Sequence, residues 1–252
     1  DVAIINGDNK LMLEQQSRFK GRVKMVSDAQ LNHYEISKTG TIFEINKSRY
    51  RFEYFLPREF FYSIAMTRLL VEYLGIEFDA SFTGFSLPPG RSSILRGIKN
   101  TTLIDSSYNA TPEGMSAIIK TFGRYPAQTK WLVLGDMIEL GSEEQEEHKK
   151  LARLVASVET SKIILIGPRI SKYTYPKLRS LVADSDKIVT FELPKEALDY
   201  IVQNIQGGET LLFKGARFLE GIIEHLLLDE NDATKLCRRE QVWQTRRKQW
   251  GL

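Results

Sequence analysis

Residues 131–167, WLVLGDMIELGSEEQEEHKKLARLVASVETSKIILIG, carry the clearest structural pattern of the sequence. Two short runs of apolar residues, 131–134 and 163–166, flank a charged segment of helical length at 142–158. Short strands that are apolar at every position are typical of a sheet buried on both faces, and a helix between two of them makes the strands parallel. This stretch therefore predicts one strand–helix–strand unit of a parallel sheet.

The same alternation continues on both sides of this unit. Further strands are expected at 101–104, 187–191 and 210–213, and further helices at 112–122, about 168–182, 194–204 and 219–228. Five strand–helix pairs predict an α/β fold with a Rossmann-like, mostly parallel, doubly wound sheet. Ligands of such sheets bind beyond the carboxyl ends of the strands, so the loops after the strands are the places to search for chemistry.

The residues before this region follow another pattern. SLPPGRS at 86–92 interrupts all periodicity, which predicts a first domain at 1–87, a second at 88–234 and a tail at 235–252. The first domain is expected to be a partial α/β domain with β-hairpins. Its expected elements are a short helix at 10–18, strands at 22–26, 33–37, 41–45 and 50–55, and a helix at 58–74.

Composition excludes several classes of protein. The 252 residues are 42% hydrophobic and 27% charged, which excludes a disordered, collagenous or disulfide-stapled chain. The apolar runs are far shorter than the ~20 residues of a membrane helix, so no integral membrane segment is expected. A single cysteine, Cys237, and an opening without the basic and apolar regions of a signal peptide favour a reducing, cytoplasmic location.

The net charge of +3 is unevenly distributed. The tail holds six basic residues and one acidic residue, whereas the other 234 residues hold 29 basic and 31 acidic ones. A near-neutral body argues against a nucleic-acid partner. The tail predicts a short amphipathic helix, with either a solvated basic face or a face that contacts an anionic surface or partner.

Polar residues follow the strand expected at 101–104, in IDSSYNATPEGM at 104–115. Asp105 is placed to accept hydrogen bonds from vicinal hydroxyls, as acidic residues do for a ribose. Tyr108 offers a flat face to a base, and Asn109 offers an amide. The same residue types also satisfy backbone groups in turns and cap helices. The residues alone leave a nucleotide site and a structural turn both open.

The loop GDMIELG, which follows the next strand, contains Asp136 and Glu139. Beyond it, Ser142 and Gln145 have the spacing of a capping box, so we interpret the acidic residues here as capping and solvating a helix start. No metal site is expected. His148 on the same helix is either structural or, because its pKa lies near neutrality, functional.

Two further loops carry cations. Lys214 and Arg217, in FKGAR between the last strand and its helix, could hold a phosphate or carboxylate, and Arg91 in PPGR could bind a phosphate bidentately. A solvated loop is the alternative in each case. The sequence has no G-x-x-x-x-G-K-[ST] or G-x-G-x-x-G stretch and no zinc spacing of cysteine and histidine, so it has no P-loop of its own.

Taken in order, four segments resemble the carboxyl-terminal half of the Mur ligase family. They are PPGR at 88–91, IDSSYNATPEGM at 104–115, VLGDMIELG at 133–141 followed by His148, and FKGAR at 213–217. The resemblance covers about residues 57–228, while residues 1–56 are similar to the later part of that family's central ATPase domain. Within the family, the greatest likeness is to enzymes that add D-alanyl-D-alanine to a UDP-N-acetylmuramoyl-tripeptide.

The resemblance implies a role for each residue at a matching position. Arg91 would contact the terminal phosphate of ATP and take part in catalysis, Asp105 would bind the ribose, and Tyr108 and Asn109 would lie by the adenine. The implied reaction is ATP- and magnesium-dependent amide formation through an acyl phosphate in peptidoglycan synthesis. Its implied partners are ATP, a UDP-N-acetylmuramoyl-peptide and a dipeptide such as D-alanyl-D-alanine.

The substrate side of the implied site would be formed by the other two loops. Asp136 and Glu139 in the first, with Lys214 and Arg217 in the second, would border the amino-acid substrate or the cleft between domains. These four residues are therefore the expected substrate-binding set.

The chain departs from the family pattern in three ways. The family's P-loop, magnesium ligands and nucleotide-sugar domain lie upstream of residue 1, so we expect a fragment or truncated relative that is inactive alone. The family's H-N-x-x-N pattern is replaced by Glu59, Phe60 and Ser63, and a second aspartate by Ser106. A non-catalytic scaffold, or a sister ligase that adds a different amino acid, therefore remains an alternative.

Overall fold

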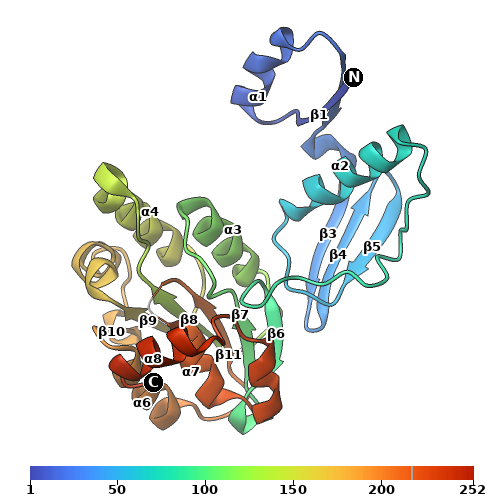
Figure 1. Cartoon of the computed structure of the whole chain (residues 1–252). Coiled ribbons are helices and arrows are strands. Elements are labelled where there is room, and N and C mark those ends of the chain that lie inside the picture. The colour runs from blue at the N-terminus through green and yellow to red at the C-terminus, as the bar shows by residue number, and fades with distance from the viewer. Residues whose placement is uncertain (217) are drawn as a thin grey trace. The chain divides into compact units, whose positions relative to one another are not determined.

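The computed structural model describes residues 1–216 and 218–252. The chain divides into two compact units, Asp1–Ser86 and Leu87–Leu252 (Figure 1). Among the described residues, no helix combines the length and apolarity needed to cross a membrane.

The first unit contains a two-stranded parallel sheet, β1–β2, and a three-stranded antiparallel sheet in the order β3–β4–β5. Its elements are β1 (Val2–Asn6), α1 (Lys10–Gln15), β2 (Arg22–Val26), β3 (Leu31–Ser37), β4 (Gly40–Ile45), β5 (Ser48–Phe52) and α2 (Phe60–Tyr73). Asn46 and Lys47 form the turn between β4 and β5 with φ of 48° and 67°, as tight hairpin turns require. The expected β-hairpins are confirmed.

Aromatic side chains fill the core of this unit. Phe60, at the start of α2, lies 5.7 Å from Phe52 and 6.3 Å from Phe43 between ring centroids, and 5.9 Å from Phe85. The pairs with Phe52 and Phe85 are edge-on, and such pairs add about 1 kcal/mol each beyond the burial of their area. Phe60 is therefore a packing residue, whereas Ser63, one turn later, is exposed.

The second unit is built on one six-stranded sheet in the order β10–β9–β8–β11–β7–β6. Five strands are parallel and β6 is antiparallel to β7, which confirms the predicted mostly parallel α/β fold. The elements are β6 (Ser93–Arg96), β7 (Thr102–Asp105), α3 (Pro112–Gly123), β8 (Lys130–Gly135), α4 (Glu144–Ala156), β9 (Lys162–Ile166), α5 (Tyr175–Arg179), β10 (Ile188–Phe191), α6 (Pro194–Asn204), β11 (Thr210–Lys214), α7 (Leu219–Leu226) and α8 (Gln241–Gln249).

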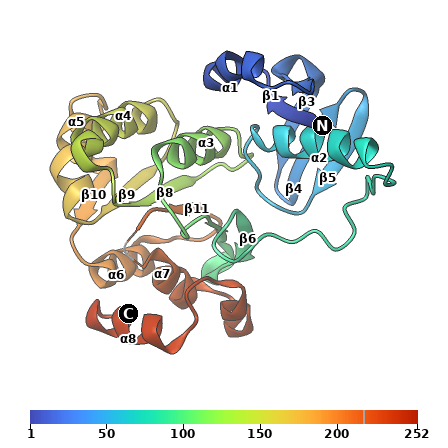
Figure 2. The ribbon, with the colours of Figure 1, turned by 45° about the horizontal axis from the view of Figure 1, so that its top comes forward.

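Helices cover both faces of this sheet. Figure 2 shows α3, α4 and α5 on one side of the strands and α6 and α7 on the other. On the second face, strand residues such as Val133 and Phe213 join Ile201 of α6 and Ile222 of α7 in one buried cluster. The continuously apolar strands follow from this arrangement, because both faces of each strand are buried.

Two local features differ from the sequence expectation. The sequence did not indicate β6, a four-residue antiparallel strand at the sheet edge directly after the PPGR turn. Beyond α7, the chain returns to this edge, where the Leu228 N–H donates to the Arg96 carbonyl at 3.0 Å. The prediction of Ser142 as a helix cap is wrong. A 3₁₀ turn at Gly141–Glu143 precedes α4, so Ser142 lies inside the helical stretch and not at its cap.

Candidate functional site

Three loops with polar residues meet at the carboxyl edge of the second unit's sheet. They follow β7, β11 and β8, which are adjacent strands although β11 is the last in sequence. The chain leaves β7 for α3 on one face and β11 for α7 on the other, so the connections diverge here (Figure 2). Such a switch point is the usual ligand site of an open parallel sheet.

Two glycines allow the ends of β8 and β11 to approach closely. A β-carbon on Gly135 would lie 2.0 Å from the Ala216 carbonyl oxygen, and one on Gly215, whose φ is 143°, would lie 2.3 Å from the Gly135 nitrogen. The Ala216 N–H donates to the Asp136 carbonyl at 3.0 Å across this crossing. The glycines of GDM and KGA therefore fix the loops that follow both strands.

Asp105 ends β7 with a fully buried carboxylate. One oxygen, Oδ1, accepts a hydrogen bond from the Ser107 N–H at 3.0 Å, but Oδ2 has no hydrogen-bond partner among the described residues. Burial raises the pKa of Asp105, opposed by hydrogen bonds from Ser107 and by the charges of Lys214 and Arg238. A buried acceptor without a partner is costly, so this oxygen is available to a hydroxyl donor from a ligand.

Lys214 ends β11 and is also buried. Burial and the charge of Arg91 lower the pKa of Lys214 to about 8, against the opposing effect of Asp105. Its ammonium nitrogen lies 3.8 Å from the position of a β-carbon on Gly114, in the first turn of α3. A cation at the start of a 12-residue helix favours an anionic ligand.

Arg91 and Tyr108 join the PPGR turn to the loop after β7. The Arg91 guanidinium carbon lies 4.5 Å from the Tyr108 ring centroid, and the Tyr108 N–H donates to the Gly90 carbonyl at 3.1 Å. Gly90 has φ of 76°, and a β-carbon there would lie 3.0 Å from both the Tyr108 side chain and the Cys237 sulfur. Tyr108 is 44% exposed, so part of its side chain is accessible from solvent beside the guanidinium of Arg91.

Asn109 is exposed and engaged locally. Its Oδ1 accepts a hydrogen bond from the Ala110 N–H at 2.7 Å. Of the alternatives left open for this loop, Asn109 therefore has the geometry of a turn residue, whereas Asp105 and Tyr108 keep groups available to a ligand.

Asp136 and Glu139 take different places in the next loop. Asp136 is buried, accepts a hydrogen bond from the Ile170 N–H at 2.8 Å and lies 3.7 Å from the Arg169 guanidinium. It thereby anchors the segment after β9, while Glu139 is exposed with φ of 63°. Arg217 lies outside the described residues.

His148 is buried and bridges three segments. Its Nδ1 lies 2.9 Å from the Thr174 hydroxyl and its Nε2 lies 3.3 Å from the Met137 carbonyl. Burial lowers the pKa of His148. This geometry favours the structural alternative for His148.

Sequence reasoning missed two residues of this region, Glu220 and Arg238. Glu220 is fully buried on α7, and Arg238 donates to its Oε2 at 3.2 Å and to the Tyr108 carbonyl at 2.7 Å. The available signal was an acidic pair, Glu220 and Glu224, in the otherwise apolar segment LEGIIEHLL, followed by a basic run. A carboxylate on an apolar helix face needs a cation nearby.

The fold is a mostly parallel α/β sheet with polar loops at its switch point, and residues 90–217 match the family model described as Mur ligase, glutamate ligase domain. The chain belongs to the Mur ligase family.

The relatives within this family share one description. The chain is similar to the UDP-N-acetylmuramoyl-tripeptide–D-alanyl-D-alanine ligases of Rickettsia prowazekii and Bacillus subtilis. With the first it is 30% identical over 65% of this chain and 36% of the relative, and with the second 26% identical over 90% and 51%. The chain thus spans about half or less of the length of the curated relatives it matches.

A solved structure supports the same fold. The MurF ligase of Thermotoga maritima in complex with ADP matches with a TM-score of 0.71 at 20% identity, over 93% of this chain and 54% of that one.

Proposed function

We propose that the chain is the carboxyl-terminal part of an ATP-dependent amide ligase of peptidoglycan synthesis, which adds D-alanyl-D-alanine to a UDP-N-acetylmuramoyl-tripeptide. The observation that carries the proposal is the unpartnered, buried oxygen of Asp105 at the switch point, beside the cation of Lys214 and the Arg91–Tyr108 stack. The proposed substrates are those in the names of the similar ligases from Rickettsia prowazekii and Bacillus subtilis.

The residues fit a purine nucleotide in chemical character. Asp105 offers an acceptor to ribose hydroxyls, the exposed Tyr108 ring offers a face to the base, with Asn109 beside it in sequence, and Arg91 offers a fork of donors to a terminal phosphate. ATP, when bound, supplies the phosphoryl group that activates a carboxylate for attack by an amine. The chain's own part is to hold and orient the nucleotide.

The substrate side is proposed on other residues. Lys214 provides a cation toward a carboxylate, Asp136 fixes the loop that presents Glu139, and Arg217 completes the set. We propose magnesium as the metal of this reaction, since it usually binds through one or two carboxylates together with the phosphates of the nucleotide.

ADP binding by the complete gene product tests the nucleotide site. Asp105→Asn keeps the size and the Ser107 contact but removes the charge, so ADP affinity should fall about 10- to 100-fold, equivalent to losing about 1.5–3 kcal/mol of charge-assisted hydrogen bonding. Asp186→Asn makes the same change at an exposed position and should bind as wild type. If Asp105→Asn binds ADP as tightly as wild type by titration calorimetry, the ribose assignment is wrong.

A non-catalytic relative is the second candidate, because of one observation in the first unit. Phe60 stands where the family helix carries an asparagine, and it is packed among Phe52 and Phe85 where it has no amide to offer a ligand. Mass spectrometry of products, with the complete gene product and a panel of nucleotide-linked peptides and amino acids, separates the two. Amide product supports the ligase and identifies its amine, and ADP binding without any product supports the scaffold.

A further inference from the structure

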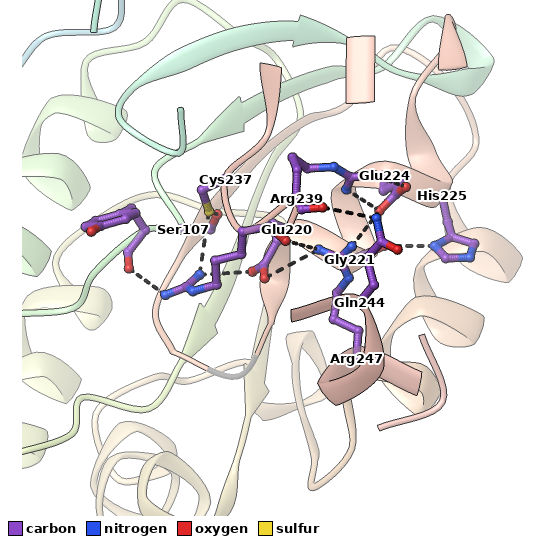
Figure 3. A network of polar contacts seen from close by, with 11 residues as sticks. Ser107, Glu220, Gly221, Glu224, His225, Cys237, Arg239, Gln244 and Arg247 are labelled. Carbon is purple, nitrogen blue, oxygen red and sulfur yellow. Dashed lines mark hydrogen bonds and ion pairs between the residues drawn. The ribbon is translucent and has the colours of Figure 1, made fainter. Parts of the chain in front are cut away.

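The tail after α7 folds back onto its own domain through ion pairs. Arg239 binds both carboxylate oxygens of Glu224 at 2.6 and 2.7 Å, and the buried Arg247 lies 3.7 Å from Glu224 and 3.8 Å from Glu220. Figure 3 shows this network reaching from Ser107 at one end to Glu224 and His225 at the other, with Gln244 and Arg247 between them. Together with Arg238, which pairs with Glu220, three of the tail's six cations therefore act inside the molecule.

Arg238 stands where this network meets the candidate nucleotide loop. One guanidinium nitrogen, Nη1, pairs with the buried Glu220 at 3.2 Å, while Nη2 donates to the Tyr108 carbonyl at 2.7 Å. The guanidinium also lies 5.6 Å from the Tyr108 ring centroid. Arg238 itself has φ of 56°, an unfavourable conformation for a residue with a side chain, which the surrounding contacts must hold in place.

Cys237 seats the tail against the same two loops. Its sulfur lies 3.9 Å from the Ser107 hydroxyl, and it would lie 3.0 Å from a β-carbon on Gly90. Adjacent tail residues thus touch the PPGR turn and the loop after β7, which carry Arg91 and Tyr108. The tail residues that make these contacts lie beyond residue 217, where the match to the family model ends.

We propose that Arg238 is a positioning residue, through which the tail at 235–252 fixes the nucleotide-binding loop at 105–109. The inference rests on the proposed function for its effect on ligand binding. Glu220 has no route to solvent, so it holds one arm of the guanidinium in a fixed place and aims the other at the Tyr108 carbonyl. A lysine would keep the charge beside Glu220 but has no planar fork to join two acceptors.

Amide exchange reports directly on the order of this loop. The N–H groups of Ser106, Ser107 and Tyr108 donate to Phe213, Asp105 and Gly90, so each is protected while the loop is in place. Arg238→Lys should raise the exchange rate of these three amides about tenfold, as expected for the loss of one charge-assisted hydrogen bond. Its urea midpoint should stay near that of wild type, because the cation beside Glu220 remains.

Three other variants frame the experiment. Arg238→Ala should show the same increase, with lower stability, because Glu220 is then left with Arg247 alone. Arg246→Ala and Arg246→Lys are matched controls on the same tail. Arg246 is exposed and, like Arg238, lies over the Trp243 ring, whereas the ion pair with Glu220 and the hydrogen bond to the Tyr108 carbonyl belong to Arg238. Both should exchange as wild type.

ADP titration of the complete gene product then connects loop order to binding. Arg238→Lys should weaken ADP binding about fivefold at unchanged stability, a result that a purely structural residue would not give. Unchanged amide exchange in Arg238→Lys overturns the inference. The inference is also wrong if Asp105→Asn weakens ADP binding but Arg238→Lys binds ADP as tightly as wild type. If wild type does not bind ADP, the proposed function fails, and the exchange rates alone decide whether Arg238 fixes the loop.

Discussion

Replacing Gly135 with alanine is expected to destabilise the domain at 87–252 by about 3 kcal/mol. The new methyl group would lie 2.0 Å from the Ala216 carbonyl oxygen, a backbone atom that cannot rotate away. Relief needs a shift of more than about 1 Å between β8 and β11, since non-bonded atoms settle near 3.5 Å. Overpacking of this kind costs about 1–3 kcal/mol, and the broken hydrogen bond from Ala216 to Asp136 adds about 1 kcal/mol.

Urea unfolding and thermal melting measure this cost. For a domain of this size about 3 kcal/mol lowers the melting temperature by about 10 °C. Gly123→Ala is the matched control, because its β-carbon would make ordinary contacts with Val158 at 3.5 and 3.7 Å at the end of α3. That variant should be as stable as wild type or slightly more stable, by about 0.5 kcal/mol.

Gly135→Ala should also alter the geometry of the candidate site. Lys214 directly precedes Gly215, so moving β11 away from β8 displaces the cation from the start of α3. If the free energy of unfolding of Gly135→Ala lies within about 1 kcal/mol of the wild-type value, the close crossing is not the reason for glycine at this position.

Three further predictions concern titrating side chains. The pKa of Lys214 is lowered to about 8, below its value in the unfolded chain, so the free energy of unfolding should rise by about 2 kcal/mol from pH 7.5 to 9.5. The urea midpoint of wild type should rise accordingly over this range, and that of Lys214→Met should not. Burial lowers the pKa of His148, so acid should destabilise the fold below about pH 6.5, with a smaller slope in His148→Gln if the buried imidazole is the cause. Burial raises the pKa of the Cys237 thiol to about 11, so a thiol reagent at pH 8 should label the native protein at least about 100-fold more slowly than the unfolded chain; equal rates would contradict its burial.

The sheet could be predicted because its signal is local. Each parallel strand is a short apolar run bounded by turn residues, and each crossover helix follows directly in sequence. By contrast, β6 has four residues after two prolines and pairs only at the sheet edge, so its pattern is too short to distinguish from a loop. The start of α4 was misplaced because a 3₁₀ turn and an α-helix begin with the same residue types.

The site could be predicted in part for a related reason. Asp105 and Lys214 end strands and Tyr108 follows one, and the topology of a parallel sheet brings such residues to one edge. No local pattern in the sequence indicates that Arg238 contacts Tyr108, which lies 130 residues earlier, or that Glu220 is buried. A basic run is ordinarily solvated, and only the fold reveals that its partners are carboxylates of the same chain.

The antiparallel strand β6 also bears on how the protein behaves at high concentration. An open sheet edge offers unpaired backbone groups on which a second molecule can add a strand and begin aggregation. Here the edge strand is short, and the chain beyond α7 already uses its end, through the hydrogen bond from Leu228 to Arg96 and the bridge between Gly97 and Leu227. The segment that leads into the tail therefore also protects this margin of the sheet from edge-to-edge association between molecules.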